Sequence, residues 1–162
     1  MEIRLLKIVL VTFVGLQGWL YLAGNLANWD AGREAVGYVL AMEGHEVYGT
    51  HLVPPVTSPV LVTIAFLVIL AGEFLVGALS LKGALDLWRA RHGNASEFGS
   101  AKTFGILGAG MAMVVWFGGF VVLGGALFQM WQTQVGLGSF DGAFTYAATS
   151  GIVLLFLNQP EA

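Results

Sequence analysis

Apolar residues fall into four long stretches along the chain, and three polar segments separate them. The stretches predict helices over about residues 5–26, 58–90, 101–127 and 142–157. An apolar helix of about 20 residues crosses a hydrocarbon core about 30 Å thick, because each residue rises about 1.5 Å. We therefore predict an all-α fold, a four-helix transmembrane bundle that forms a single domain over residues 1–162.

The first apolar stretch follows Arg4 and Lys7 and runs from Ile8 to Ala23, a pattern that also describes a secretory signal peptide. It is longer than the about 7–15 apolar residues of a signal peptide, and no clear A-x-A cleavage site follows it. We therefore expect an uncleaved first helix.

The polar segments predict the connections between these helices. In the first, over residues 28–57, Gly32 to Met42 has apolar residues at 36, 39, 40 and 42. That spacing favours a short amphipathic helix lying at the membrane interface. We expect a polar turn over residues 91–100 and a short loop over residues 128–141.

Composition excludes several classes of protein. The chain is 57% hydrophobic and 10% charged, whereas a soluble domain carries about 25% charged residues. A net charge of −3 is no footprint for nucleic acid. The absence of cysteine excludes disulfides, thiolate metal sites and thiol nucleophiles.

The distribution of positive charge predicts the orientation in the membrane. Lys and Arg concentrate at the N-terminus and around the second connection, at Arg4, Lys7, Lys82, Arg89, Arg91 and Lys102, against Arg33 in the first connection. Because positive residues stay in the cytoplasm, both termini are predicted to be cytoplasmic and the amphipathic helix to lie in the first outer loop. The interfacial tryptophans would be Trp29 and Trp131 on the outer side and Trp88 on the inner side.

Small residues in the third stretch predict close helix packing. Gly105 with Ala109, and Gly108 with Ala112, form small-x-x-x-small pairs, which let helix backbones approach closely in a membrane. The alternative is that glycine is merely tolerated in lipid.

Glu73 is a carboxylate near the centre of the second apolar stretch. Together with Gln17, Trp116 and Ser150 (or its neighbour Thr149) it falls near a helix midpoint, so we expect these residues to share one layer of the bundle. An intramembrane carboxylate often belongs to a proton or cation pathway. The alternative, which we favour, is a protonated Glu73 that hydrogen-bonds Gln17 or a hydroxyl and holds the helices together, because no membrane-embedded cation accompanies it.

His45 and His51, near Glu43 and Glu46, are weak candidates for a metal site. Their spacing matches no standard helical or zinc-ribbon pattern, so we expect a solvated loop. No histidine lies within a predicted span, which excludes a bis-His haem inside the chain. No phosphate-binding loop and no nucleophile beside a base is found, so we expect no cofactor and no enzymatic activity.

Several segments together resemble a bacterial family of predicted small integral membrane proteins that carry a domain of unknown function. They run in order along the chain: RLLKIVLV, GNLANW, VLAME, TSP, GEFLVGALSLKGALDLWRAR, FGILGAGMAMVVWFGGFVVLGG, FQMWQTQ and LLFLNQP. The resemblance implies four helices in a bacterial inner (plasma) membrane. It implies no activity.

We therefore expect a multi-pass membrane protein that is a structural or accessory subunit of a larger complex, for example a respiratory or photosynthetic one. Its partners would be the lipid bilayer and other membrane protein subunits. The alternative is a small proton-coupled transporter that works as a dimer through Glu73. Transporters often contain repeats, and residues 1–81 and 101–158 show no convincing similarity.

Overall fold

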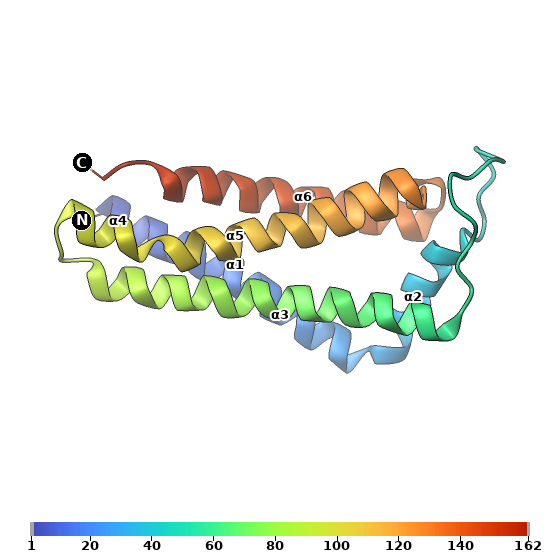
Figure 1. The fold of residues 1–162 in the computed structure, drawn as a ribbon, viewed down its shortest axis with the longest axis horizontal. Helices are drawn as coiled ribbons and strands as arrows, with labels where there is room; N and C mark the ends of the chain where they lie inside the picture. Colours follow the sequence, from blue (N-terminus) through green and yellow to red (C-terminus); the bar gives the residue numbers. More distant parts are fainter. Residues whose placement is uncertain (1, 162) are drawn as a thin grey trace.

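The computed structural model describes residues 2–161, and its long helices lie side by side in a bundle (Figure 1). They are α1 (Glu2–Ala27), α3 (Pro59–Ala90), α5 (Thr103–Met113), which continues as η1 (Val114–Leu127), and α6 (Gln134–Asn158). Four helices are long and apolar enough to cross a membrane, the third of them counted from Ala95 to Leu127. The predicted all-α bundle of four apolar helices is confirmed.

The described residues also form three short helices: α2 (Trp29–Ala41), α4 (Ala95–Ala101) and η2 (Met130–Gln132). The first of these is the amphipathic helix predicted in the first connection, and it begins three residues before the predicted start at Gly32. It ends at Ala41, and the next residue, Met42, has a left-handed backbone (φ 54°) and donates its amide to the Val39 carbonyl.

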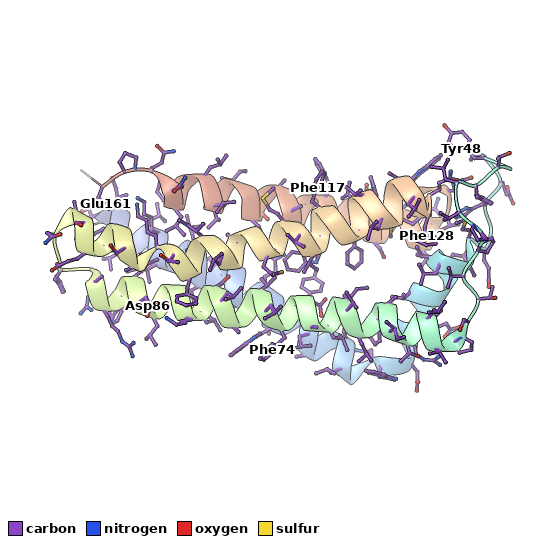
Figure 2. All side chains as sticks on the ribbon, in the orientation of Figure 1. Tyr48, Phe74, Asp86, Phe117, Phe128 and Glu161 are labelled. Carbon is purple, nitrogen blue, oxygen red and sulfur yellow. The ribbon has the colours of Figure 1, made fainter. Side chains whose placement is uncertain are left out.

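The chain enters and leaves the bundle at one end, which we name the terminal end (Figure 1). The opposite end, with residues 43–57 and η2, is the loop end. Figure 2 shows Glu161 and Tyr48 at these opposite ends. Trp88 lies near the terminal end with Arg91 3.9 Å above its ring, whereas Trp29 packs on Phe66 toward the loop end. Trp131 contacts Tyr48 at the loop end.

Glycine and other small residues bring α3 and α5 together. Gly105, Gly108, Ala109 and Ala112 are all buried. A Cβ on Gly108 would fall 2.6 Å from the Ser80 amide nitrogen and 2.8 Å from its Cα, closer than real Cβ contacts come. Gly83 of α3 lies as tightly against the backbone of Gly105. These contacts place Gly105 and Gly108 at the close approach of α5 to α3.

The last helix begins earlier than predicted. It starts at Gln134 rather than near residue 142, so the predicted loop over 128–141 is wrong and the connection is confined to residues 128–133. The reason is a cap, because the Thr133 hydroxyl accepts from the Gly136 amide at 3.1 Å. The predicted polar turn over 91–100 is also largely helical. Asn94 and Glu97 form a reciprocal capping box there that starts α4.

The third span changes its helical type midway. From Val114 to Leu127 it is a π-helix, in which the Phe128 amide still donates to the Leu123 carbonyl at 2.9 Å. Long π-helices are rare, and short ones occur often at functional sites. The apolar pattern predicted a helix here but not its π-helical type, and the segment forms one wall of a cleft.

Two apolar clusters fill the bundle. One lies around Trp116 and consists of Val14, Val76, Ala109, Ala112, Val115, Trp116, Ala143 and Ala147. The other is nearer the terminal end and consists of Ile8, Val11, Ala84, Leu87, Phe98 and Leu157.

Candidate functional site

Glu73 is buried on α3, with 2% of its surface exposed, and its partner is Asn25. The Asn25 Nδ2 donates to Oε1 at 2.8 Å and to Oε2 at 3.0 Å. The predicted partner, Gln17 or a hydroxyl, is wrong: the Gln17 Nε2 is buried and finds no hydrogen-bond partner in the described chain. Asn25 is in the last turn of α1, where the sequence indicated the exit from the membrane.

Glu73 lies near the middle of α3. It is 14 residues from Pro59 and 17 from Ala90, which is about 21 Å and about 26 Å at about 1.5 Å per residue. The pairing therefore joins the middle of α3 to the last turn of α1.

The other members of the predicted layer are engaged elsewhere or unpaired. Trp116 is buried, with its ring centroid 6.1 Å from that of Tyr21 and 5.7 Å from that of Tyr146. The two tyrosine hydroxyls also contact each other. The Ser150 hydroxyl is buried and has no partner in residues 2–161. The aromatic group was missed by sequence reasoning, because tyrosines inside apolar helices look like lipid-facing ones.

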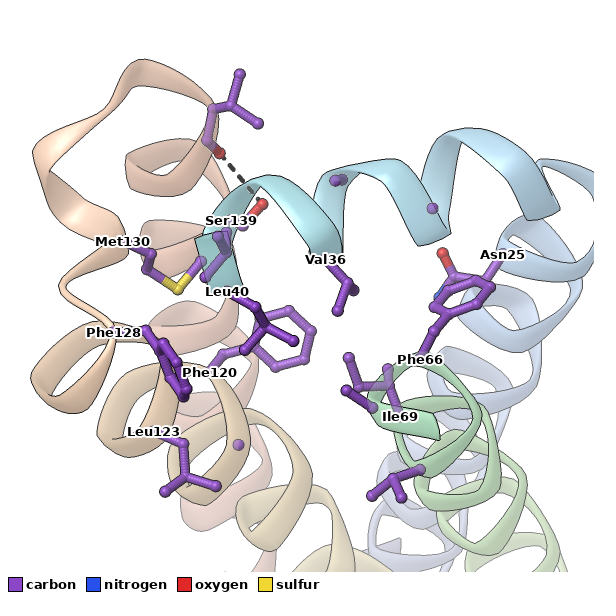
Figure 3. Close-up of a pocket in the computed structure, with 18 residues that line it drawn as sticks. Asn25, Val36, Leu40, Phe66, Ile69, Phe120, Leu123, Phe128, Met130 and Ser139 are labelled. Atoms are coloured by element: carbon purple, nitrogen blue, oxygen red, sulfur yellow. Dashed lines mark hydrogen bonds between the residues drawn. The ribbon is translucent and has the colours of Figure 1, made fainter. Parts of the chain in front are cut away.

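An apolar cleft of about 440 Å³ lies in the part of the bundle nearer the loop end, next to the Glu73–Asn25 pair (Figure 3). Its walls are α2, α3, η1 and the first turns of α6. Asn25 stands in this wall, with Phe66 and Ile69 on one side and Phe120 and Leu123 on the other. One feature of the sequence could have indicated this cleft, namely the glycines of the third span. Gly119 and Gly124 line the cleft, whereas the other glycines of this span pack against neighbouring residues or have open space outside it.

The two histidines of the first connection lie together, with ring centroids 5.4 Å apart. Burial, and then the charge of His51, lower the pKa of His45. His51 Nδ1 lies 3.4 Å from Gln129 Oε1. Within residues 2–161 no group of three His, Cys, Asp or Glu side chains is arranged to hold a metal ion.

A cluster of buried charges at the terminal end was not predicted. Glu161 Oε1 accepts from Lys7 Nζ at 2.5 Å and from Lys102 Nζ at 2.6 Å. Both lysines also donate to the Gln159 carbonyl, at 3.1 and 2.6 Å. Arg4 Nε lies 3.5 Å from Glu161 Oε2. The cluster therefore ties the C-terminal segment to α1 and to the start of the third span.

Charge and burial act in opposite directions on Glu161. Burial alone would raise the pKa of its carboxyl, but hydrogen bonds and charges from Lys102 and Lys7 outweigh burial and lower it. Glu161 is therefore ionised, which suits two lysine side chains that are 1% and 7% exposed. Sequence reasoning counted these lysines only for membrane orientation.

The outward faces of the long helices are apolar. Leu20, Leu155 and Ile152 are each at least about two-thirds exposed, and Phe74 and Phe117 are about half exposed (Figure 2). Such faces are stable in lipid, so the fold defines a multi-pass α-helical integral membrane protein.

Comparison with known families agrees with this class. Residues 3–160 match the family described as "Predicted small integral membrane protein (DUF2165)", and the chain belongs to that family. No curated protein and no solved structure matches the chain.

Proposed function

We propose that this protein is a structural or accessory subunit of a larger complex in a bacterial inner membrane, for example a respiratory or photosynthetic assembly, with both termini in the cytoplasm. The proposed role is non-enzymatic. The observation that carries it is the environment of Glu73. Its two hydrogen bonds come from one amide, that of Asn25, and no Lys, Arg or His of the described chain pairs with it. The hydrogen bonds between Asn25 and Glu73 therefore join α1 to α3.

The packing below Glu73 supports the same role. The apolar cluster of Ile8, Val11, Ala84, Leu87, Phe98 and Leu157 fills the bundle between Glu73 and the charged group around Lys7. A proton relay needs a chain of polar groups or water. This cluster interrupts such a chain.

One lipid-facing surface suits a partner helix. Gly110 of α5 and Gly118 of η1 have open space where a Cβ would be, and Leu107, Val114 and Phe117 beside them are 51%, 63% and 49% exposed. Helices associate in lipid through small residues that let backbones approach closely. We therefore place the contact with another subunit on this face.

The test is extraction of the tagged protein from its native membrane with surrounding lipid retained. We expect a particle larger than one chain that contains a reproducible second protein. Gly118→Leu should release that protein, because Leu prevents close approach on this face. Gly138→Leu is the matched control, since Gly138 of α6, like Gly118, has open space where a Cβ would be. A lone chain in the wild-type preparation would contradict the proposal.

The second candidate is a small proton-coupled transporter that works as a dimer through Glu73. The observation in its favour is a set of buried polar atoms without hydrogen-bond partners in residues 2–161, Gln17 Nε2, Ser80 Oγ and Ser150 Oγ. Proton flux through the purified protein in liposomes, compared between wild type and Glu73→Gln, separates the two roles.

A further inference from the structure

The cleft at the loop end has the size and lining of a ligand site. Its volume of about 440 Å³ falls within the about 300–1,000 Å³ that is usual for small-molecule pockets. Side chains of α1, α2, α3, η1, η2 and α6 line it, and α2 covers it on the side of the first connection (Figure 3). The proposed subunit role does not use this cleft.

The π-helical wall leaves room inside the cleft. One face of this helix turns toward the cleft. The residues on that face are Gly119, Phe120, Leu123 and Gly124. A Cβ built on Gly119 would meet nothing within 4 Å, so the space in front of this residue is open. An occupant can therefore lie against the backbone of η1 there.

The polarity of the lining restricts the chemistry of the occupant. Asn25 and Ser139 are its polar side chains, and the lining contains no charged residue. Ser139 donates to the Val135 carbonyl at 3.3 Å. The Asn25 Nδ2 is used by Glu73, whereas its Oδ1 receives no hydrogen bond from the described residues. The Asn25 Oδ1 lies next to Gly32 of the cleft lining, 3.7 Å from the position that a Cβ on Gly32 would occupy.

We propose that the cleft binds one molecule of a neutral, hydroxyl-bearing lipid. Its apolar chain lies between Ile69 and Leu123, and its hydroxyl donates to Asn25 Oδ1, which can only accept. An anionic headgroup is excluded because Glu73 lies behind Asn25 and no cation lines the cleft, so a buried charge would go unpaired. The polar end of the lipid lies beside Asn25, in the last turn of α1.

Two sources supply this chemistry, acylglycerols and isoprenoid alcohols. The experiment titrates the purified full chain in detergent with monoolein and with geranylgeraniol, and counts bound molecules by native mass spectrometry. Methyl oleate, which has no hydroxyl, and oleate, which is anionic, are the comparison ligands. We expect saturable binding of one molecule of at least one hydroxyl-bearing lipid, with methyl oleate several-fold weaker and oleate weaker still. Which hydroxyl lipid binds more tightly identifies the source.

The matched variants are neighbours on η1. Gly119→Leu fills the cleft, whereas Gly118→Leu adds the same side chain on the outer face, where there is also open space. We expect Gly119→Leu to weaken binding at least about ten-fold, because overpacked sites do not accommodate added side chains. Gly118→Leu should bind as wild type. Val36→Phe fills the cleft from α2 and serves if Gly119→Leu does not fold (Figure 3).

Three outcomes would overturn the site. They are no saturable binding of either hydroxyl lipid, equal binding to the folded cleft-filled variant and to Gly118→Leu, and methyl oleate or oleate binding as well as the hydroxyl lipids. These outcomes are independent of the subunit role, which the native-membrane extraction tests separately.

Discussion

Gly108 of α5 lies so close to Ser80 of α3 that a Cβ on the glycine would stand 2.6 Å from the serine amide nitrogen. The contact is with backbone as well as side chain, so a rotamer change cannot relieve it. The two helices therefore cross at a point where glycine is required by space, and this contact positions the wall of the bundle that continues into η1.

Gly108→Ala should destabilise the protein by about 1–3 kcal/mol, the usual cost of overpacking. Gly110→Ala, two residues along α5, should be neutral or stabilising by up to about 1 kcal/mol, because the Cβ there meets nothing and Ala favours the helix. Thermal unfolding of both variants in detergent measures the difference. Equal melting temperatures would contradict the close crossing.

Removing the Glu161 carboxylate should lower the free energy of unfolding by more than Gly108→Ala does. Glu161→Gln leaves Lys7 and Lys102 buried without their anion. Breaking a buried ion pair from one side costs about 3–5 kcal/mol. Asp86→Asn is a control, because its ion pair with Lys82 is half exposed and should change stability by less than about 1 kcal/mol. The free energy of unfolding, measured by denaturant titration in mixed micelles, should rank the variants in this order.

The stability of the wild-type protein should fall in acid. The pKa of Glu161 is lower in the folded protein than the about 4.3 of an unfolded chain. Its stabilisation is therefore complete above about pH 4.3 and is lost as the pH falls through the folded-state pKa. The melting temperature should decline more steeply below about pH 4.3 for wild type than for Glu161→Gln. Parallel curves would show that the carboxylate is not coupled to folding.

The orientation of the bundle is predicted from the Lys and Arg distribution alone. Six of the seven Lys and Arg residues flank the terminal end or the second connection, so that end should be cytoplasmic. A reporter that is active only outside the cytoplasm, fused after residue 162, should give no signal. The same reporter inserted at Gly49, which has open space around it, should be active. The opposite pattern of signals would show that the terminal end lies outside the cytoplasm and would contradict the predicted orientation.

The number and class of the helices could be predicted because long apolar stretches have few alternatives in a chain so poor in charge. The ends of the helices were harder to predict from the sequence, because the Thr133 cap and the Asn94–Glu97 capping box depend on a few polar atoms. The π-helix left no trace in the apolar pattern. The small-residue packing of Gly105 and Gly108 was predictable from spacing.

The polar partners were the hardest to predict. Sequence position suggested Gln17 for Glu73, but the partner is Asn25, because the carboxylate side chain reaches along α3 toward the end of α1. The pairing of Lys7 with Glu161 joins opposite ends of the chain, and sequence spacing carries no information about such a contact.

The role of Glu73 as a link between helices predicts its response to truncation. Glu73→Leu leaves the Asn25 amide without its acceptor and should cost about 1–3 kcal/mol. Glu73→Gln keeps the shape and an acceptor oxygen, so its melting temperature should stay close to that of wild type. A Glu73→Leu protein as stable as wild type would contradict the structural role of the pair.

The most direct test of the account is proton flux through purified protein in liposomes that contain a pH-sensitive dye. A structural Glu73 predicts that wild type and Glu73→Gln both acidify the liposomes no faster than protein-free controls under an imposed pH gradient. A proton carrier needs a group that takes up and releases a proton, which an amide does not do. Flux through wild type that Glu73→Gln abolishes while keeping its melting temperature would contradict the account and establish the transporter.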